Sequence, residues 1–164
     1  MRKIVVVSAL LVLAMLGAVL VHAAPKLESY RMDRQFVGSV GPATVQSTEF
    51  RPVSNWGFSD GAAIRARGAI AVTLSAVVEG GPAEFRILME LPERDWAVRP
   101  MRPSRVRFDP GSAAQPFSFT FVTWVPDGPY TINLFWRSPS GAEVTLTSGT
   151  VAIQYGNAAR SAGR

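Results

Sequence analysis

Five arginines within fourteen residues form the densest group of side chains in this chain that could bind a ligand. They are Arg94, Arg99, Arg102, Arg105 and Arg107, and Trp96 lies among them. A guanidinium donates paired hydrogen bonds to carboxylate, sulfate or phosphate groups, and an indole ring offers a flat apolar surface to a sugar. These six residues are therefore the candidate binding site for an anionic polysaccharide or an acidic protein surface.

The same arginines also fit a purely structural role. Glu93, Asp95 and Asp109 are close enough in sequence to neutralise them, and charges on a strand edge discourage edge-to-edge pairing. Trp56 and Phe58, in a predicted loop, fit either ligand stacking or plugging the open end of a sandwich. The pattern favours the structural role in both cases.

Nucleophilic catalysis has no candidate residues beyond the N-terminal segment. His22 is the only histidine, and the chain has no cysteine. A Ser-His-Asp arrangement, a Cys-His pair and a zinc or copper site with soft ligands are excluded once His22 is removed. We expect no enzymatic activity, no cofactor and no bound metal.

Acidic residues leave two further possibilities. Glu90, Glu93 and Asp95 could act as paired carboxylates of a small hydrolase, but their predicted positions on a strand and a loop offer no cleft. Three turn aspartates could bind calcium, although such residues more often bond their own backbone. These three are Asp60, Asp109 and Asp127.

The N-terminus has the pattern of an export signal. Two basic residues precede an apolar run over residues 4–21, and small residues surround the expected cleavage site after Ala23. We predict a secretory signal peptide over residues 1–23 and a secreted or periplasmic location. If the signal stayed uncleaved, the apolar run would instead anchor the protein in a membrane.

The remainder of the chain fits one domain of a bacterial exported protein. Removing 23 of the 164 residues leaves 141, with no cysteine and no glycosylation acceptor. Without Arg2 and Lys3, 15 of the 17 basic residues remain against 12 acidic ones. This mild positive charge does not call for a nucleic-acid partner.

Apolar residues alternate with polar ones along most of the chain, which predicts strands. Residues 24–41 are expected to be an extended leader or a loosely docked first strand, residues 42–156 the β-sandwich domain, and residues 157–164 a disordered tail. Strands are expected over 44–52, 64–78 with a bulge at Gly68, 85–91, 105–108, 117–125, 130–136 and 144–155 with a one-residue bulge near Ser148. About seven strands without helical periodicity indicate an all-β, antiparallel two-sheet β-sandwich of immunoglobulin-like architecture.

One short motif supports that architecture. Asp127, Gly128 and Tyr130 resemble the tyrosine corner of immunoglobulin-like sandwiches, in which the tyrosine hydroxyl bonds to nearby backbone. The Cys, Trp, Cys spacing of true immunoglobulin domains is absent, so the resemblance implies an architecture and no family. We also expect Trp124 and Trp136 to lie in or beside the core.

The sequence thus predicts an exported, non-catalytic β-sandwich that serves as a protein-interaction or structural module of the cell envelope. Its partner would be an envelope or extracellular protein. The alternative is a carbohydrate or polyanion binding module that uses the segment from Arg94 to Arg107, and a carboxylate hydrolase is a distant third. A further interaction mode is donor-strand pairing, in which residues 26–40 lend a strand to a neighbouring molecule.

Overall fold

The structure is a computed structural model that describes residues 34–54, 56, 61–91 and 97–156. The predicted signal peptide at 1–23 and the predicted tail at 157–164 lie outside these described residues. Within the part of the chain that is described, no helix has the length and hydropathy that a membrane crossing needs.

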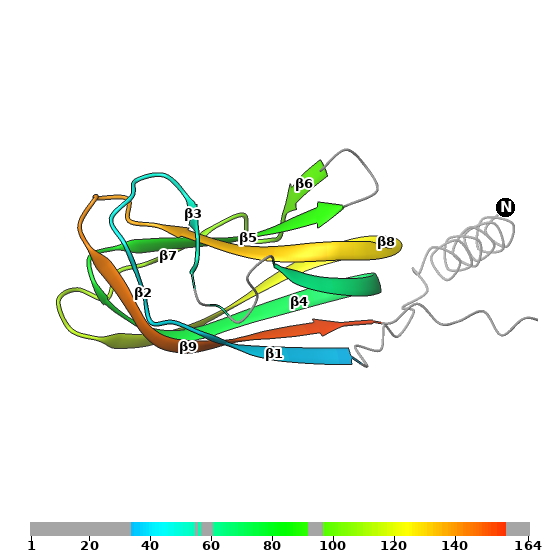
Figure 1. The fold of residues 1–164 in the computed structure, drawn as a ribbon, viewed down its shortest axis with the longest axis horizontal. Helices are drawn as coiled ribbons and strands as arrows, with labels where there is room; N and C mark the ends of the chain where they lie inside the picture. Colours follow the sequence, from blue (N-terminus) through cyan, green and yellow to red (C-terminus); the bar gives the residue numbers. More distant parts are fainter. Residues whose placement is uncertain (1–33, 55, 57–60, 92–96, 157–164) are drawn as a thin grey trace, which may run out of the picture.

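Antiparallel strands make up the described fold (Figure 1). They are β1 (Arg34–Val40), β2 (Ala43–Val45), β3 (Arg51–Pro52), β4 (Ala62–Gly80), β5 (Ala83–Leu91), β6 (Ala97–Pro100), β7 (Val106–Phe108), β8 (Gln115–Arg137) and β9 (Val144–Tyr155). Hydrogen bonds join them in the order β1-β9-β4-β8-β5-β6, with β2 on β9, β3 on β8 and β7 on β5. The prediction of an all-β, antiparallel fold is confirmed.

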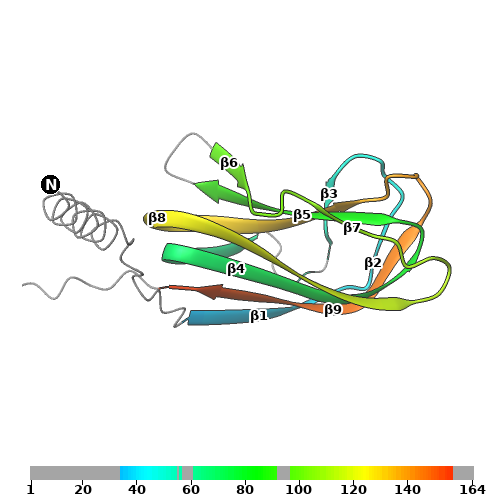
Figure 2. The same ribbon diagram turned by 180° about the vertical axis from the view of Figure 1, so that it is seen from behind.

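Two long strands divide this sheet into two layers, as Figures 1 and 2 show from opposite sides. β4 has 19 residues and β8 has 23. Straight strands of these lengths would span roughly 60 Å or more at about 3.3 Å per residue, so both strands must bend. The first layer contains β1, β9, residues 68–80 of β4 and residues 115–125 of β8. The second layer contains residues 62–66 of β4, residues 128–137 of β8, and β3, β5, β6 and β7.

The bend lies at Gly68, where the sequence predicts a bulge. The β4–β8 register shifts between Ala66 and Gly68, and Gly68 has a φ of 88°, a conformation that favours glycine. The predicted bulge is confirmed. The prediction of separate strands over 117–125 and 130–136 is wrong, because β8 bends opposite this bulge and stays paired with β4 on both sides.

The tyrosine hydrogen bond spans the bend in β8. The Tyr130 hydroxyl donates to the Pro126 carbonyl oxygen at 2.7 Å, and the ring is buried. The contact that the sequence resemblance implied is therefore present, although Tyr130 lies inside a long strand.

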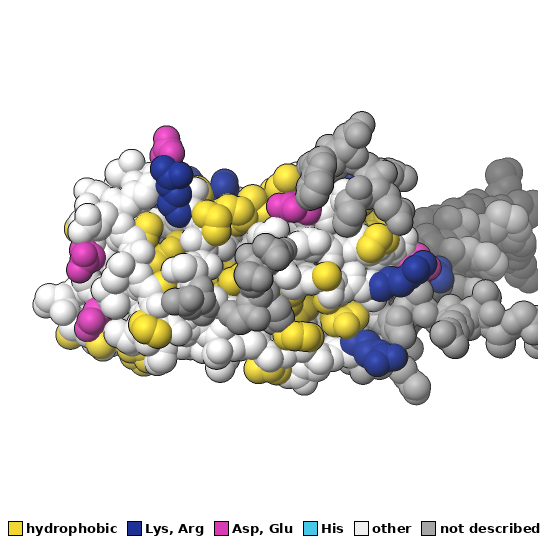
Figure 3. All heavy atoms as spheres, in the orientation of Figure 1, with side chains coloured by type: hydrophobic (Ala, Val, Ile, Leu, Met, Phe, Trp, Pro, Cys, Tyr) yellow, Lys and Arg dark blue, Asp and Glu magenta, His cyan; other side chains and the backbone are white. Residues whose placement is uncertain are grey.

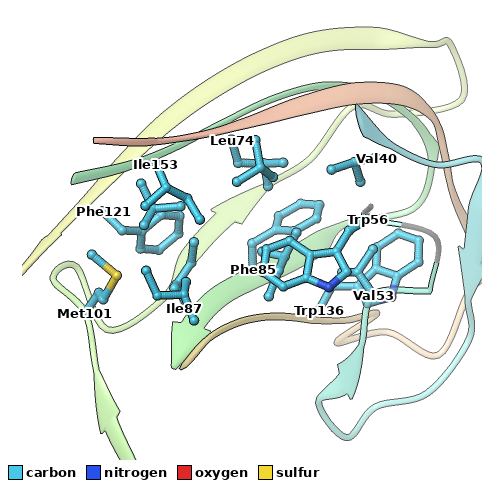
Figure 4. Packing of buried hydrophobic residues seen from close by; sticks show 14 of the residues in the cluster. Val40, Val53, Trp56, Leu74, Phe85, Ile87, Met101, Phe121, Trp136 and Ile153 are labelled. Carbon is cyan, nitrogen blue, oxygen red and sulfur yellow. The ribbon is translucent and has the colours of Figure 1, made fainter. Parts of the chain in front are cut away.

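Inward-facing side chains of the two layers form one core. Alternate residues are buried on β4, β5, β8 and β9, as the period-two pattern predicts. Figure 4 shows Leu74 and Ile153 pointing from the first layer toward Phe85 and Trp136 of the second. Trp136 is only 1% exposed, which confirms its predicted core position.

A second bulge keeps the core face of β9 in phase. Val77 pairs with Ser148 and Val78 with Leu146, so Thr147 is the extra residue. Its hydroxyl donates to the Val77 carbonyl oxygen at 3.3 Å. The predicted one-residue bulge near Ser148 is confirmed.

The segment from residue 44 to residue 52 differs from the single predicted strand. β2 pairs with β9 in the first layer, and β3 pairs with β8 in the second. Residues 46–50 between them cross from one layer to the other, so their backbone cannot continue either ladder. Trp56 follows this crossing, is 5% exposed and belongs to the core cluster, so its ring is packed inside the protein; Phe58 lies outside the described residues.

Trp124 is the clearest error in the predicted core. It is 54% exposed, because β8 turns its even-numbered side chains outward from residue 118 to residue 124. Glu84 is a charged residue paired in register with Arg107 and Arg137, and it is nevertheless buried, with 7% exposure.

Candidate interaction surfaces

The described part of the arginine segment, residues 97–107, connects strands of the two layers. Arg94 and Trp96 lie outside the described residues, whereas Arg99, Arg102, Arg105 and Arg107 are all exposed. The chain leaves β6, forms an isolated bridge with β8 in the first layer, and returns to β5 as β7. Val106 and Phe108 of β7 pack against the core.

The structure does not gather these arginines on one face. Arg102 exchanges two backbone hydrogen bonds with Val122, at 2.8 and 2.7 Å, so its side chain lies on the outer side of the first layer. In the β5–β7 register, Arg107 lies opposite Glu84. Its side chain is therefore on the outer side of the second layer. Arg102 and Arg107 of the predicted site therefore lie on opposite faces of the described fold.

Glu84 is the carboxylate that lies nearest to Arg105 in the second half of the arginine segment. Its Oε2 accepts hydrogen bonds from Nε and Nη2 of Arg137 at 2.9 and 2.7 Å, and Nη1 of Arg105 lies 3.9 Å away. Arg137 also donates to the Thr48 carbonyl oxygen at 3.2 Å. This network ties β5, β8 and the crossing segment together.

Phe50 joins the same network through its ring. The Cζ atoms of Arg86 and Arg137 lie 4.0 and 4.7 Å from the ring centroid, within the range of cation–π attraction. Burial, and secondly the nearby Arg137 charge, lowers the pKa of Arg86. Its buried Nε has no hydrogen-bond partner among the described residues. The Phe50 ring of the crossing segment thus lies against guanidinium groups of both β5 and β8.

Three of the candidate acids have partners within the described fold. Glu90 accepts a hydrogen bond from the Asn133 amide at 3.0 Å, and Asp109 accepts one from the Gly111 backbone at 3.3 Å. Asp127 lies 3.5 Å from Arg65. Across the described ranges, no three His, Cys, Asp or Glu side chains come together as a metal site requires. Asp60, Glu93 and Asp95 lie outside those ranges.

A surface that the sequence analysis missed covers the outer side of the first layer. The strand registers place side chains from four strands there, and none of these side chains carries a charge. We call this surface the uncharged face. Its residues are Gln35, Val37 and Ser39 of β1; Ser148, Thr150, Ala152 and Gln154 of β9; Ala69, Ala71, Thr73, Ser75 and Val77 of β4; and Pro116, Ser118, Thr120, Val122 and Trp124 of β8.

Among the described residues, the charged side chains nearest to this face lie at its borders. On β4 the flanking charged residues are Arg67 and Glu79, and Arg102 lies beside β8. A charge-free centre inside a charged rim is the usual composition of a protein interface. Figure 3 shows another side of the molecule, on which charged side chains are sparse and lie mainly toward the margins.

Three large apolar side chains are exposed on the uncharged face. The exposed fractions are 57% for Val37, 45% for Val122 and 54% for Trp124. Tryptophan is the residue type most enriched among those that dominate binding energy at interfaces. Val122 and Trp124 are two residues apart on one strand, so their side chains lie next to each other.

Hydroxyl groups in the centre of the face are already paired with one another. Oγ1 of Thr73 lies 2.9 Å from Oγ1 of Thr120, and Oγ of Ser75 lies 2.8 Å from Oγ of Ser118. Covering an unpaired hydroxyl is costly, whereas these groups keep a partner when water is removed. A partner could therefore cover this polar part of the face at low cost.

The uncharged face is nearly large enough for a specific complex. Four strands about 4.8 Å apart and nine residues of about 3.3 Å give roughly 500 Å², or about 1,000 Å² counted over two partners, the lower limit for a specific interface. A shallow depression of about 420 Å³ opens at one end. It is lined by Ser75, Ala76, Val77, Pro116, Phe117, Ser148, Gly149 and Thr150.

Comparisons with known proteins assign no family. No family model matches the chain, and no curated protein matches its sequence. The solved structures that resemble it include the Eiger TNF of S. frugiperda, with 9% identity, a TM-score of 0.44 and coverage of 79% of this chain and 98% of that one.

Two other similar structures come from different classes of protein. The infectious bursal disease virus VP2 subviral particle has 14% identity and a TM-score of 0.40, with coverage of 82% of this chain and 36% of that one. The CBM22-1 xylan-binding domain of Paenibacillus barcinonensis Xyn10C has 14% identity and a TM-score of 0.36, with coverage of 60% and 66%. Such distant similarity assigns no function to this chain.

Proposed function

We propose that this chain is an exported, non-catalytic β-sandwich module of the bacterial cell envelope, which binds another envelope protein through the uncharged face. The absence of charge from that face, together with the exposed Trp124, is the observation that supports this most. The partner surface should be flat and uncharged as well, because a charge buried against this face would find no counter-charge. Export rests on the signal-like residues 1–23.

The composition of the chain supports a non-catalytic role. After residue 23 the sequence has no histidine and no cysteine, so no side chain is suited to activate a nucleophile near neutral pH. The candidate carboxylate Glu90 is held by Asn133 on a strand. These observations favour binding through the protein surface over catalysis.

Position-specific photo-crosslinking in the producing cells tests the proposed surface. A photoreactive amino acid replaces Val122 or Thr120 on the uncharged face, and Ala63 serves as the control because it is exposed on the outer side of the second layer. We expect the same envelope protein to be crosslinked from positions 120 and 122, but not from position 63. Equal crosslinking from all three positions, no adduct, or adducts only with a second copy of this chain would reject the proposal.

The second candidate function is binding of an anionic polysaccharide. Its specific support is that Arg99, Arg102 and Arg107 are exposed and form no ion pair among the described residues, while Arg105 shares Glu84 with Arg137. Retention on heparin that salt reverses, and that is lost when Arg102, Arg105 and Arg107 become Ser, would support it. Elution at low salt that these changes leave unaltered would reject it.

A further inference from the structure

β1 is an edge strand whose outer side faces away from the molecule. It stands at one end of the strand order and pairs with β9 over all seven of its residues. No other strand of the described chain pairs with β1, and Figures 1 and 2 both place it at the border of the fold. Its outward backbone N–H and C=O groups can therefore accept another strand.

The sequence of β1 itself lacks the features that usually protect such an edge. It contains no proline and no bulge, and its only charged residue, Arg34, is at its first position. Phe36 and Val37 point to opposite sides of the strand and are 42% and 57% exposed. The strand at the other end of the order, β6, differs because it ends in Arg99 and Pro100, both of which discourage pairing.

The sequence of β1 is complementary to itself when two copies run antiparallel about Val37. In this register Phe36 lies opposite Gly38, Gln35 opposite Ser39, and Arg34 opposite Val40 of the second copy. An aromatic ring thus covers a glycine, two polar residues face each other, and the two arginines are kept apart. Such self-complementarity is what a two-fold symmetric interface requires.

We propose that two copies of this chain form a dimer by pairing their β1 strands antiparallel around Val37. The first layer of each copy then continues into that of the other, and the two uncharged faces become one surface. This inference does not depend on the function proposed above, because it concerns the strand edge and not the binding of a partner to the face.

Engineered cysteines test the register directly, because the chain has no cysteine of its own. With Val37→Cys, the two Cβ atoms at the dimer axis would be about 5 Å apart, close enough for a disulfide under mild oxidation. Gln35→Cys and Ser39→Cys should not crosslink to themselves, since equal positions are about 13 Å apart in this register. A mixture of those two variants should crosslink to each other.

Two results of the crosslinking experiment would overturn the proposal. One is the absence of a covalent dimer with Val37→Cys in the chain expressed from its full coding sequence. The other is self-crosslinking of Gln35→Cys or Ser39→Cys as rapid as that of Val37→Cys, which would exclude this register.

Sedimentation velocity provides an independent test without oxidation. We expect the unmodified protein to show a dimer fraction that rises with concentration, and Val37→Lys to reduce that fraction at least tenfold by placing two ammonium groups together. Val122→Lys is the matched control, since Val122 is equally an exposed strand valine, 45% exposed on β8, and should leave the dimer intact. A monomer at every concentration, or equal effects of the two variants, would reject the β1 dimer.

Discussion

The Glu84–Arg137 pair should contribute far more stability than any surface ion pair of this protein. Glu84 accepts hydrogen bonds of 2.9 and 2.7 Å from one guanidinium, and the side chains of Glu84 and Arg137 are 9% and 26% exposed. Breaking a buried pair costs about 3–5 kcal/mol, and the remaining exposure of Arg137 lowers this value. We predict that Glu84→Gln reduces the free energy of unfolding by about 2–3 kcal/mol.

Urea and thermal unfolding of matched variants measure this effect. The loss corresponds to a decrease in Tm of about 10 °C for a domain of this size. Glu49→Gln is the control, because the Glu49–Arg51 pair is 3.5 Å apart with side chains 80% and 63% exposed, and such pairs contribute at most about 0.5 kcal/mol. A double-mutant cycle that combines Glu84→Gln with Arg137→Met should show that the losses of unfolding free energy from the two substitutions are not additive.

One result would refute this reasoning about the network. If Glu84→Gln were as stable as Glu49→Gln, the carboxylate would not be anchoring the crossing segment. In that case, the exposure of Arg105 and Arg107 could no longer be explained by Glu84 being already occupied by Arg137.

Two further variants test the bends that hold the layers together. Tyr130→Phe removes the 2.7 Å hydrogen bond to the Pro126 carbonyl and should cost about 1–1.5 kcal/mol, measured by urea unfolding; an unchanged midpoint would contradict the tethering role. Gly149→Ala places a Cβ 2.6 Å from the Ser75 carbonyl oxygen and 2.7 Å from the Ala76 Cβ, so we expect a loss of about 2 kcal/mol or more. Thermal unfolding within 2 °C of the wild type would show that the close approach of β9 to β4 is relaxed.

Local sequence patterns were sufficient to predict most of the fold. Alternation along β4 identified its buried side correctly, and Gly68 marked the bend because only a glycine fits readily at that φ. The bulge at Thr147 followed from the change of phase between Leu146 and Val151, both of which must stay buried. These features depend on neighbours within one strand or one turn.

The features that were not predicted depend on contacts between distant residues. Glu84 is buried because Arg137, 53 residues later, lies beside it, and no local pattern indicates that partner. Trp124 is a different kind of error, because alternation along β8 itself, with Phe117 and Phe121 inward, turns residue 124 outward. The division of the arginines between two faces follows from the Arg102–Val122 bridge, which periodicity cannot reveal.

Predicting the uncharged face requires knowledge of the strand order. On β4 its residues are small and uncharged, as Ala71, Thr73 and Ser75 illustrate, but a single strand of this kind is common. The absence of charge becomes informative when β1, β9, β4 and β8 are known to be neighbours. That order requires pairings between residues up to about 120 positions apart in sequence.

The affinity of the crosslinked partner for variants of the uncharged face is the most direct test of the proposed function. The partner identified from position 122 is purified, and its Kd is measured against the wild type, Val122→Arg and Ala63→Arg. We predict at least a tenfold weaker affinity for Val122→Arg, because an arginine there would be buried without a counter-charge, and less than a twofold change for Ala63→Arg. Equal affinities for the wild type and Val122→Arg, or a larger loss with Ala63→Arg, would contradict binding through this face.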